Sequence, residues 1–342
     1  MKNRMWKVTF ALFLCFAILI PAMILGGAVP SNAATINLTY SNFFPPSHIQ
    51  SKLAAAWCKE VEKRTGGKVK ITYYPGQTLT KAKNCYDGVV NGLSDLGMSV
   101  LGYTRGRFPV MEAVDLPMGY TSGKMTNKVV NAVYNKFKPK EFNDTKVMYF
   151  TACGPGLLFT KSKPVKRLED LKGMKIRGHG TTAALIKALG GVPVAMPMPE
   201  LYQALQKGVV EGAFYPMEVN KGWKMAEQVK YGTLAYSCAF TSSFFVVMNK
   251  KKWNALPDDV KKTIETINKE WIVKHAAAWD SSDEEGRKFL LSKGGKLFKL
   301  SPDEAKRWKE ASKPVIAAYI AKMKKKGIDG KEIVDYILSL LK

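Results

Sequence analysis

The chain has 342 residues, and 53 lysines and arginines against 28 acidic residues give it a formal net charge of +25. This length exceeds one typical hydrophobic core and predicts two domains, while the charge raises nucleic acid as a partner. The lysines are spread along the whole chain, often beside acids, without an arginine-rich run that alternates with aromatics; this pattern argues against nucleic acid and indicates a solvated basic surface that anionic lipid headgroups can attract.

Residues 1–33 are typical of a secretory signal peptide. Three basic residues precede an apolar run at 8–24, and a small-residue cleavage signal ends at Ala33. The apolar run is short for a membrane span, which disfavours the alternative of an uncleaved anchor. We expect cleavage after Ala33 or Ala34 and a mature periplasmic protein. The peptide carries three basic and no acidic residues, so its removal lowers the net charge to +22.

The next 120 residues or so alternate predicted strands with predicted helices. Apolar alternation and runs predict strands at 36–40, 69–74, 96–100 and 146–152. Apolar residues at helical spacing predict helices at 48–65, 81–91 and 125–137. Short turns rich in glycine and proline separate these elements. This order predicts an α/β domain with a largely parallel sheet.

The same alternation restarts at residue 157. Predicted strands follow at 157–160, 174–177, 192–194, 209–214 and 244–248. A helical turn is predicted at 168–172, and helices are predicted at 181–189, 199–207, 303–326 and 331–341. Residues 258 to about 291 form a helical pattern much longer than the usual helix.

We therefore expect two α/β domains with a ligand cleft between them and one long helix that spans both. Domain I is expected to hold residues 35–153 and 242–280. Domain II is expected to hold residues 154–241 and 281–342, and it carries Arg177.

Arg177 is the main candidate for ligand binding. It is one of eight arginines in the chain and ends a predicted strand directly before a glycine-flanked turn and a helix. A guanidinium matches a carboxylate with two parallel hydrogen bonds, and the amides of a helix start favour anions. Ligands of open α/β sheets lie beyond the carboxyl ends of strands, where Val100 and Tyr215 also fall. The alternative is a surface arginine in a strand–turn–helix connection.

Further candidates lie at the junctions of predicted strands and loops. The aromatic members are Phe43, Phe44, Phe214, Tyr215 and Phe240. Ordinary core packing explains most of them, and Tyr215 is the best exception because it directly follows a strand. Asn42 and Phe44 complete the ligand-binding candidates of the first domain. Glu218 could accept a ligand ammonium or hydroxyl, or pair with Lys221 or Lys224. We expect His179 to face solvent in its turn.

The motifs of enzymes and cofactor sites are weak or missing. The pattern Gly178-x-Gly180-x-x-Ala183 only superficially matches a dinucleotide fingerprint, because no second nucleotide-binding half follows. The sequence contains no G-x-S-x-G motif and no C-x-x-C pair, and its three histidines are scattered. We therefore expect no cofactor, no metal and no catalytic residues.

Four cysteines remain after removal of the signal peptide. Export permits disulfides, and four cysteines allow three pairings. Cys58 and Cys85 lie on consecutive predicted helices joined through one strand, so we expect them to be paired. Cys153 and Cys238 would then be free and buried.

Motifs in a fixed order resemble the solute-binding proteins of tripartite ATP-independent periplasmic (TRAP) transporters, the DctP family. The most informative segments are LEDLKGMKIR at 168–177 and ALQKGVVEG at 204–212. The other segments that carry the resemblance are 61–71, 74–79, 88–97, 108–109, 115–117 and 248–257. Each is modest alone, but together they cover essentially the whole mature chain.

The resemblance implies a two-domain periplasmic-binding-protein-like fold that closes around a ligand. It implies a receptor, not an enzyme, that delivers a small organic acid to a membrane permease driven by an ion gradient. The carboxylate-binding arginine of the family falls on Arg177, and an assisting asparagine falls on Tyr215. Polar contacts of sialic-acid binders fall near Leu157 and Val100, which argues against sialic acid and favours a smaller or flatter carboxylate.

The identity of the ligand remains open at this level. Dicarboxylates, keto acids, aromatic acids and amino-acid-like ligands all fit the sequence. We expect a monomer. The alternatives to transport are a sensor that docks on a receptor kinase and a secreted enzyme, although no acid–base pair or nucleophile suggests the latter.

Overall fold

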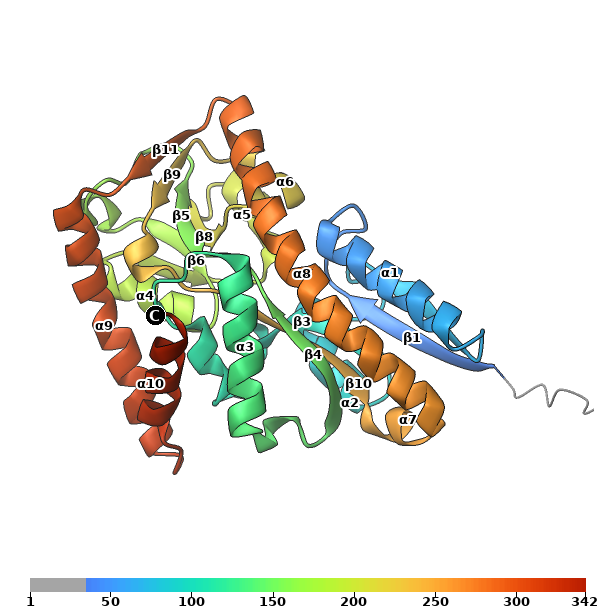
Figure 1. Ribbon diagram of the computed structural model, residues 1–342. Helices are drawn as coiled ribbons and strands as arrows, with labels where there is room; N and C mark the ends of the chain where they lie inside the picture. The colour runs from blue at the N-terminus through green and yellow to red at the C-terminus, as the bar shows by residue number, and fades with distance from the viewer. Residues whose placement is uncertain (1–34) are drawn as a thin grey trace, which may run out of the picture. The chain divides into compact units, whose positions relative to one another are not determined.

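Residues 35–342 are described by a computed structural model, whose strands form two separate sheets (Figure 1). The predicted signal peptide and its cleavage site lie outside the described residues. Within residues 35–342, no helix is both long enough and apolar enough to cross a membrane.

The first sheet has five strands in the order β2-β1-β3-β10-β4. Their bounds are Ile36–Asn42 for β1, Val69–Tyr74 for β2, Leu96–Val100 for β3, Thr145–Ala152 for β4 and Ser243–Asn249 for β10. β1 pairs in parallel with β2 and β3, and β10 pairs antiparallel with β3 and β4. The helices that accompany this sheet are α1 (Ile49–Arg64), α2 (Cys85–Val90), α3 (Gly123–Phe137) and α7 (Lys250–Asn254).

The second sheet has six strands in the order β11-β9-β5-β8-β6-β7. Their bounds are Gly156–Thr160 for β5, Lys175–Gly178 for β6, Val192–Ala195 for β7, Gly212–Pro216 for β8, Tyr231–Leu234 for β9 and Lys296–Lys299 for β11. The helices here are α4 (Thr181–Ala188), α5 (Met198–Gln206), α6 (Val219–Gly222), α9 (Pro302–Lys324) and α10 (Gly330–Leu340). Short 3-10 segments join the elements, among them η2 (Leu101–Tyr103) after β3.

Both sheets are mixed, whereas the sequence suggested largely parallel pairing. β5 runs antiparallel to β8 and β9, as β10 does to its neighbours. Each of these two strands begins where the chain arrives from the other sheet: β5 directly follows β4, and β10 follows β9. The crossovers therefore reverse the strand direction in each sheet.

Helix α8 (Asp258–Ser292) has 35 residues and contacts elements of both sheets (Figure 1). Asp258 and Asp259 stand in its first turn, where acidic side chains favour the helix dipole. The Trp279 indole donates 2.8 Å to the Thr151 hydroxyl beside the first sheet. Further on, Gly286 packs against the backbone after β8, where an added Cβ would clash with the Met217 carbonyl oxygen. This helix therefore ties the two sheets together.

The structure contradicts the predicted Cys58–Cys85 disulfide. All four cysteines of the described residues are buried free thiols. Cys58 projects from α1 into one hydrophobic cluster, and Cys85 belongs to a second cluster at α2. Burial raises the pKa of the Cys58 thiol and raises that of Cys85 to about 12. Consecutive helices can thus pack into different parts of the core, which spacing along the chain does not show.

Candidate functional site

A small cavity of about 30 Å³ lies where the carboxyl ends of β3, β6 and β8 come together. Most of its wall is apolar or aromatic, from Phe43, Phe44, Val100, Tyr103, Cys153, Met198, Phe214, Tyr215, Pro216, Val219, Trp223 and Phe244. The remaining lining residues are Arg177, His179, Glu218 and Ser242. Both sheets contribute, so the cavity lies at the position expected for a ligand site of open α/β sheets.

Arg177 carries a buried guanidinium without an acidic partner among residues 35–342. Only 2% of the residue is exposed. Nε donates 3.0 Å to the Met196 carbonyl, and Nη1 lies 3.5 Å from the Phe214 carbonyl. Burial lowers the pKa of the guanidinium because water no longer stabilises its charge. A buried charge with neutral neighbours alone is costly, so this group is suited to an anionic ligand.

Tyr103 is a site residue that the sequence reasoning missed. It lies in η2, which directly follows β3 of the first sheet. Its hydroxyl accepts the Met198 N–H at 2.9 Å and lies 3.5 Å from Nη2 of Arg177. With both contacts accepted, the hydroxyl hydrogen remains available to a ligand acceptor. The sequence signal was its place three residues after a strand that ends at Val100.

His179 is buried, so the expectation of a solvent-facing turn histidine was wrong. Its Nε2 lies 3.1 Å from the Ser242 hydroxyl, and Nδ1 has no hydrogen-bond partner among the described residues. Burial and the charge of Arg177 hold its pKa well below the usual value, which keeps the ring neutral. The next residue, Gly180, has φ of +50°, and an added Cβ at Gly102 would lie 3.0 Å from His179 Nδ1, so two glycines make room for the buried ring.

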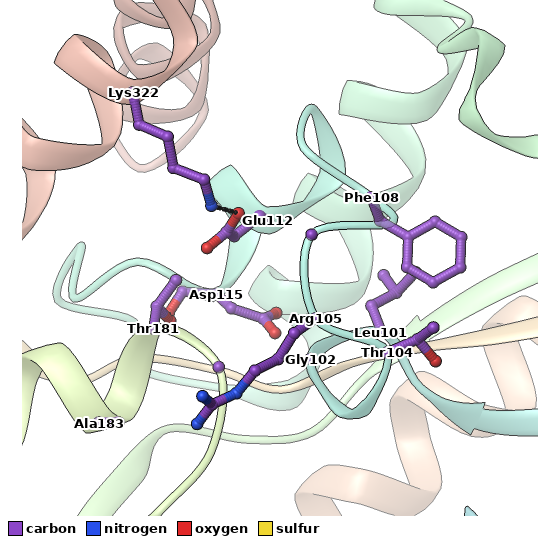
Figure 2. Close-up of a pocket in the computed structure, with 12 residues that line it drawn as sticks. Leu101, Gly102, Thr104, Arg105, Phe108, Glu112, Asp115, Thr181, Ala183 and Lys322 are labelled. Atoms are coloured by element: carbon purple, nitrogen blue, oxygen red, sulfur yellow. Dashed lines mark hydrogen bonds and ion pairs between the residues drawn. The ribbon is translucent and has the colours of Figure 1, made fainter. Parts of the chain in front are cut away.

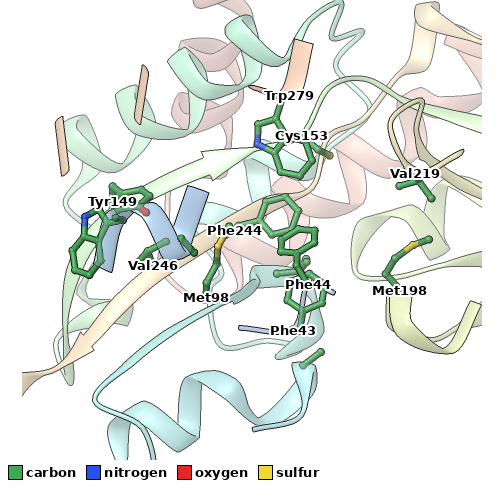
Figure 3. Packing of buried hydrophobic residues seen from close by; sticks show 14 of the residues in the cluster. Phe43, Phe44, Met98, Tyr149, Cys153, Met198, Val219, Phe244, Val246 and Trp279 are labelled. Carbon is green, nitrogen blue, oxygen red and sulfur yellow. The ribbon is translucent and has the colours of Figure 1, made fainter. Parts of the chain in front are cut away.

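Stacked aromatic rings form one side of the cavity, and Figure 3 shows Phe43, Phe44 and Phe244 side by side below Trp279. The rings of Phe43 and Phe244 are 6.2 Å apart and nearly parallel, and Phe244 stacks on Trp279 at 5.3 Å. Trp223, which follows α6 of the second sheet, stacks on Phe43 at 6.0 Å. Flat surfaces of this kind favour a flat apolar ligand.

Glu218 pairs with His48, a partner that the sequence did not suggest. Glu218 Oε2 and His48 Nε2 are 2.9 Å apart, and both side chains are nearly fully buried. Lys221 instead pairs with Glu285. The His48–Glu218 contact joins the start of α1 to the end of β8, so it links the two sheets beside the cavity.

The other predicted site residues fall in and beside this cavity. Val100, Phe44, Phe214 and Tyr215 line it. Tyr215 stacks on Phe159 at 4.4 Å, and its hydroxyl donates 3.2 Å to Asn220 Oδ1.

Two predicted residues do not line the cavity. Leu157 is buried in the hydrophobic core on β5. Asn42 accepts the Phe44 N–H at 3.0 Å and donates to Met98 Sδ. It therefore shapes the turn that carries Phe44.

A second hollow lies next to the cavity, between η2, η3 (Met111–Asp115) and the start of α4 (Figure 2). Arg105, Glu112, Asp115 and Lys322 are its charged lining residues. Lys322 pairs with Glu112 at 2.6 Å. None of the ligand-binding residues predicted from the sequence lines this hollow.

A family model for bacterial extracellular solute-binding proteins, family 7 (DctP), matches residues 40–323. The chain belongs to this family. The predicted resemblance is thus confirmed, and with it the two-domain periplasmic-binding-protein-like fold. Members of the DctP family are solute receptors, not enzymes; they are periplasmic and work with membrane permease components.

Solved structures of TRAP solute-binding proteins are similar to this DctP-family chain over most of its length. A protein from Desulfovibrio salexigens is 36% identical, with a TM-score of 0.79, and the match covers 90% of this chain and 96% of that one. That structure is an open complex with the C-terminus of a symmetry mate in its ligand-binding site. A marine metagenome protein specific for aromatic acids, in complex with 3-hydroxybenzoate, is 30% identical with a TM-score of 0.85 (90% and 98% covered). A Rhodoferax ferrireducens protein with copurified benzoate is 29% identical with a TM-score of 0.84 (90% and 97% covered).

Proposed function

We propose that this receptor captures an aromatic monocarboxylate and delivers it to a TRAP permease. The single observation that carries the proposal is the buried guanidinium of Arg177, which faces an aromatic cavity and has no acidic partner among the described residues. A carboxylate would supply the missing negative charge through two parallel hydrogen bonds. Tyr103 would donate a third hydrogen bond to the same group.

Two features favour one carboxylate on a flat ring. Arg177 is the one lysine or arginine among the residues that line the cavity, so a second carboxylate would find no cation there. The stacked rings of Phe43, Phe244 and Trp223 match a planar ligand. The relatives that bind 3-hydroxybenzoate and benzoate support the same ligand class.

Capture would proceed by closure of two domains over the ligand. We place domain I at residues 35–153 and 242–280 and domain II at 154–241 and 281–342. Each sheet falls within one of these sets. Contacts between the two proposed domains, such as the hydrogen bond from the Met198 N–H to the Tyr103 hydroxyl, would form as the cleft closes. The closed surface would then be recognised by the permease, with the receptor acting as a monomer after cleavage at about Ala33.

A ligand series tests the proposal by thermal shift and calorimetry on the mature protein. Benzoate at a hundredfold excess over its Kd should stabilise the fold by about 2.7 kcal/mol. Benzyl alcohol, which lacks the carboxylate, and succinate, which lacks the ring, should shift the melting temperature far less. Strong binding of succinate with none of benzoate would overturn the proposal.

A further inference from the structure

Glu218 is a second charged residue in the lining of the same cavity, and it also lines a separate hollow with His48 and Gly222. Only 3% of the residue is exposed, and it lines the cavity together with Arg177. The two residues form no ion pair with each other, and they are held by separate neighbours. Arg177 contacts Met196, Phe214 and Tyr103, whereas Glu218 contacts His48. The lining of the cavity therefore includes one basic and one acidic residue that are held apart from each other.

The surrounding chain fixes the position of Glu218. Its backbone N–H donates 2.8 Å to Asp283 on α8. An added Cβ at Gly222 would lie 2.6 Å from Glu218 Oε2 and 2.7 Å from the His48 ring. Only a residue without a side chain leaves room there for the pair. The carboxylate is thus held in place before any ligand arrives.

His48 satisfies one oxygen of this carboxylate and leaves the other available. His48 Nδ1 accepts the Gln50 N–H at 3.2 Å as the cap of α1, which places the ring hydrogen on Nε2. That hydrogen is donated to Glu218 Oε2 at 2.9 Å. No hydrogen-bond donor among the described residues reaches Oε1 of Glu218. A carboxylate with a single donor keeps free acceptor capacity, because its two oxygens can accept several hydrogen bonds.

We propose that Glu218 accepts a hydrogen bond from a hydroxyl group on the ring of the ligand, so that the receptor selects hydroxy-substituted aromatic monocarboxylates. This inference rests on the proposed function, since it assumes a carboxylate on Arg177. The ring would lie along the Phe43 and Trp223 surface with its hydroxyl at Glu218. The charge of Glu218 also repels a second carboxylate, so aromatic dicarboxylates are rejected at the same position.

A calorimetric series on the wild-type mature protein provides the first test. The ligands are benzoate, its three monohydroxy isomers, the corresponding methoxy compounds and isophthalate. At least one hydroxy isomer should bind about tenfold more tightly than benzoate or more, because its partner is a charged acceptor. Its methoxy counterpart, which cannot donate, should lose that advantage, and isophthalate should bind more weakly than benzoate. Equal binding of benzoate and all hydroxy isomers would overturn the inference, while loss of benzoate binding itself would overturn the proposed function.

Variants of Glu218 then assign the effect to this residue. Glu218→Met removes the acceptor and should abolish the hydroxyl advantage, measured as the ratio of the affinities for the hydroxy isomer and for benzoate within the same variant. Glu218→Gln removes the charge and should reduce the penalty on isophthalate. The matched control is Glu227→Gln, an exposed acid nearby that accepts from Tyr202. Retention of the full hydroxyl advantage in Glu218→Met, with benzoate binding intact, would contradict the inference; if neither variant folds, the wild-type series decides.

Discussion

Replacement of Arg177 by methionine separates a ligand-binding arginine from a structural one. Methionine fills much of the same volume without charge. In the ligand-free protein the change removes a buried, unpaired cation and leaves the Met196 and Phe214 carbonyls without their donor. An unsatisfied carbonyl costs about 1 to 3 kcal/mol, and relief of the buried charge offsets part of that cost. The free energy of unfolding should therefore fall by less than the roughly 2 to 6 kcal/mol that two such carbonyls would cost.

The affinity for a carboxylate should respond much more strongly. Loss of one partner of a buried ion pair costs about 3 to 5 kcal/mol, which corresponds to a loss in affinity of roughly 10² to 10³-fold or more at 1.4 kcal/mol per tenfold. The assay is calorimetry with benzoate, together with a thermal melt of each ligand-free protein. Arg167→Met, at an exposed arginine, is the control. A large drop in melting temperature with benzoate affinity retained would show that Arg177 supports the fold rather than the ligand.

Three further predictions concern Tyr103, Asp115 and the thiols. Tyr103→Phe should weaken benzoate binding by about tenfold, as expected for one lost hydrogen bond, while Tyr202→Phe at a surface hydroxyl leaves it unchanged; equal affinities in calorimetry would remove Tyr103 from the site. Burial raises the pKa of Asp115 from 3.8 to about 8, so the folded state retains a proton that the unfolded chain loses between these values, and stability falls as pH rises through this window. Asp115→Asn should therefore melt above wild type at pH 8, with a smaller gap at pH 5, and a gap independent of pH would contradict this reading. A thiol reagent should label no cysteine of the native mature protein and four after unfolding, since all four are buried and reduced. Labelling of only two cysteines after unfolding would contradict this and would support the Cys58–Cys85 disulfide.

The sequence predicted most of the fold because its apolar periods and its glycine and proline turns agree with each other. The strands at 69–74 and 96–100 and the long helix that begins at Asp258 match the structure. β9 and β11 were missed because Gly232 interrupts the apolar pattern of one and lysines stand at both ends of the other. The reversed direction of β5 and β10 depends on which sheet receives them, and local pattern carries no such information.

The candidate site was predictable for those residues whose position depends only on the strand that carries them. Arg177 and Tyr215 lie at strand ends and reach the cavity for that reason. Tyr103, His48 and the burial of His179 depend on contacts between distant segments, so neither composition nor spacing indicates them. His48 is 170 positions from its partner Glu218.

A crystal structure of the mature receptor with benzoate tests the central claim most directly. We expect both carboxylate oxygens within about 2.9 Å of the Arg177 guanidinium. The ring should lie against Phe43 and Trp223. A benzoate bound in this cavity with its carboxylate away from Arg177, or bound only at the neighbouring hollow beside Arg105, would contradict the claim.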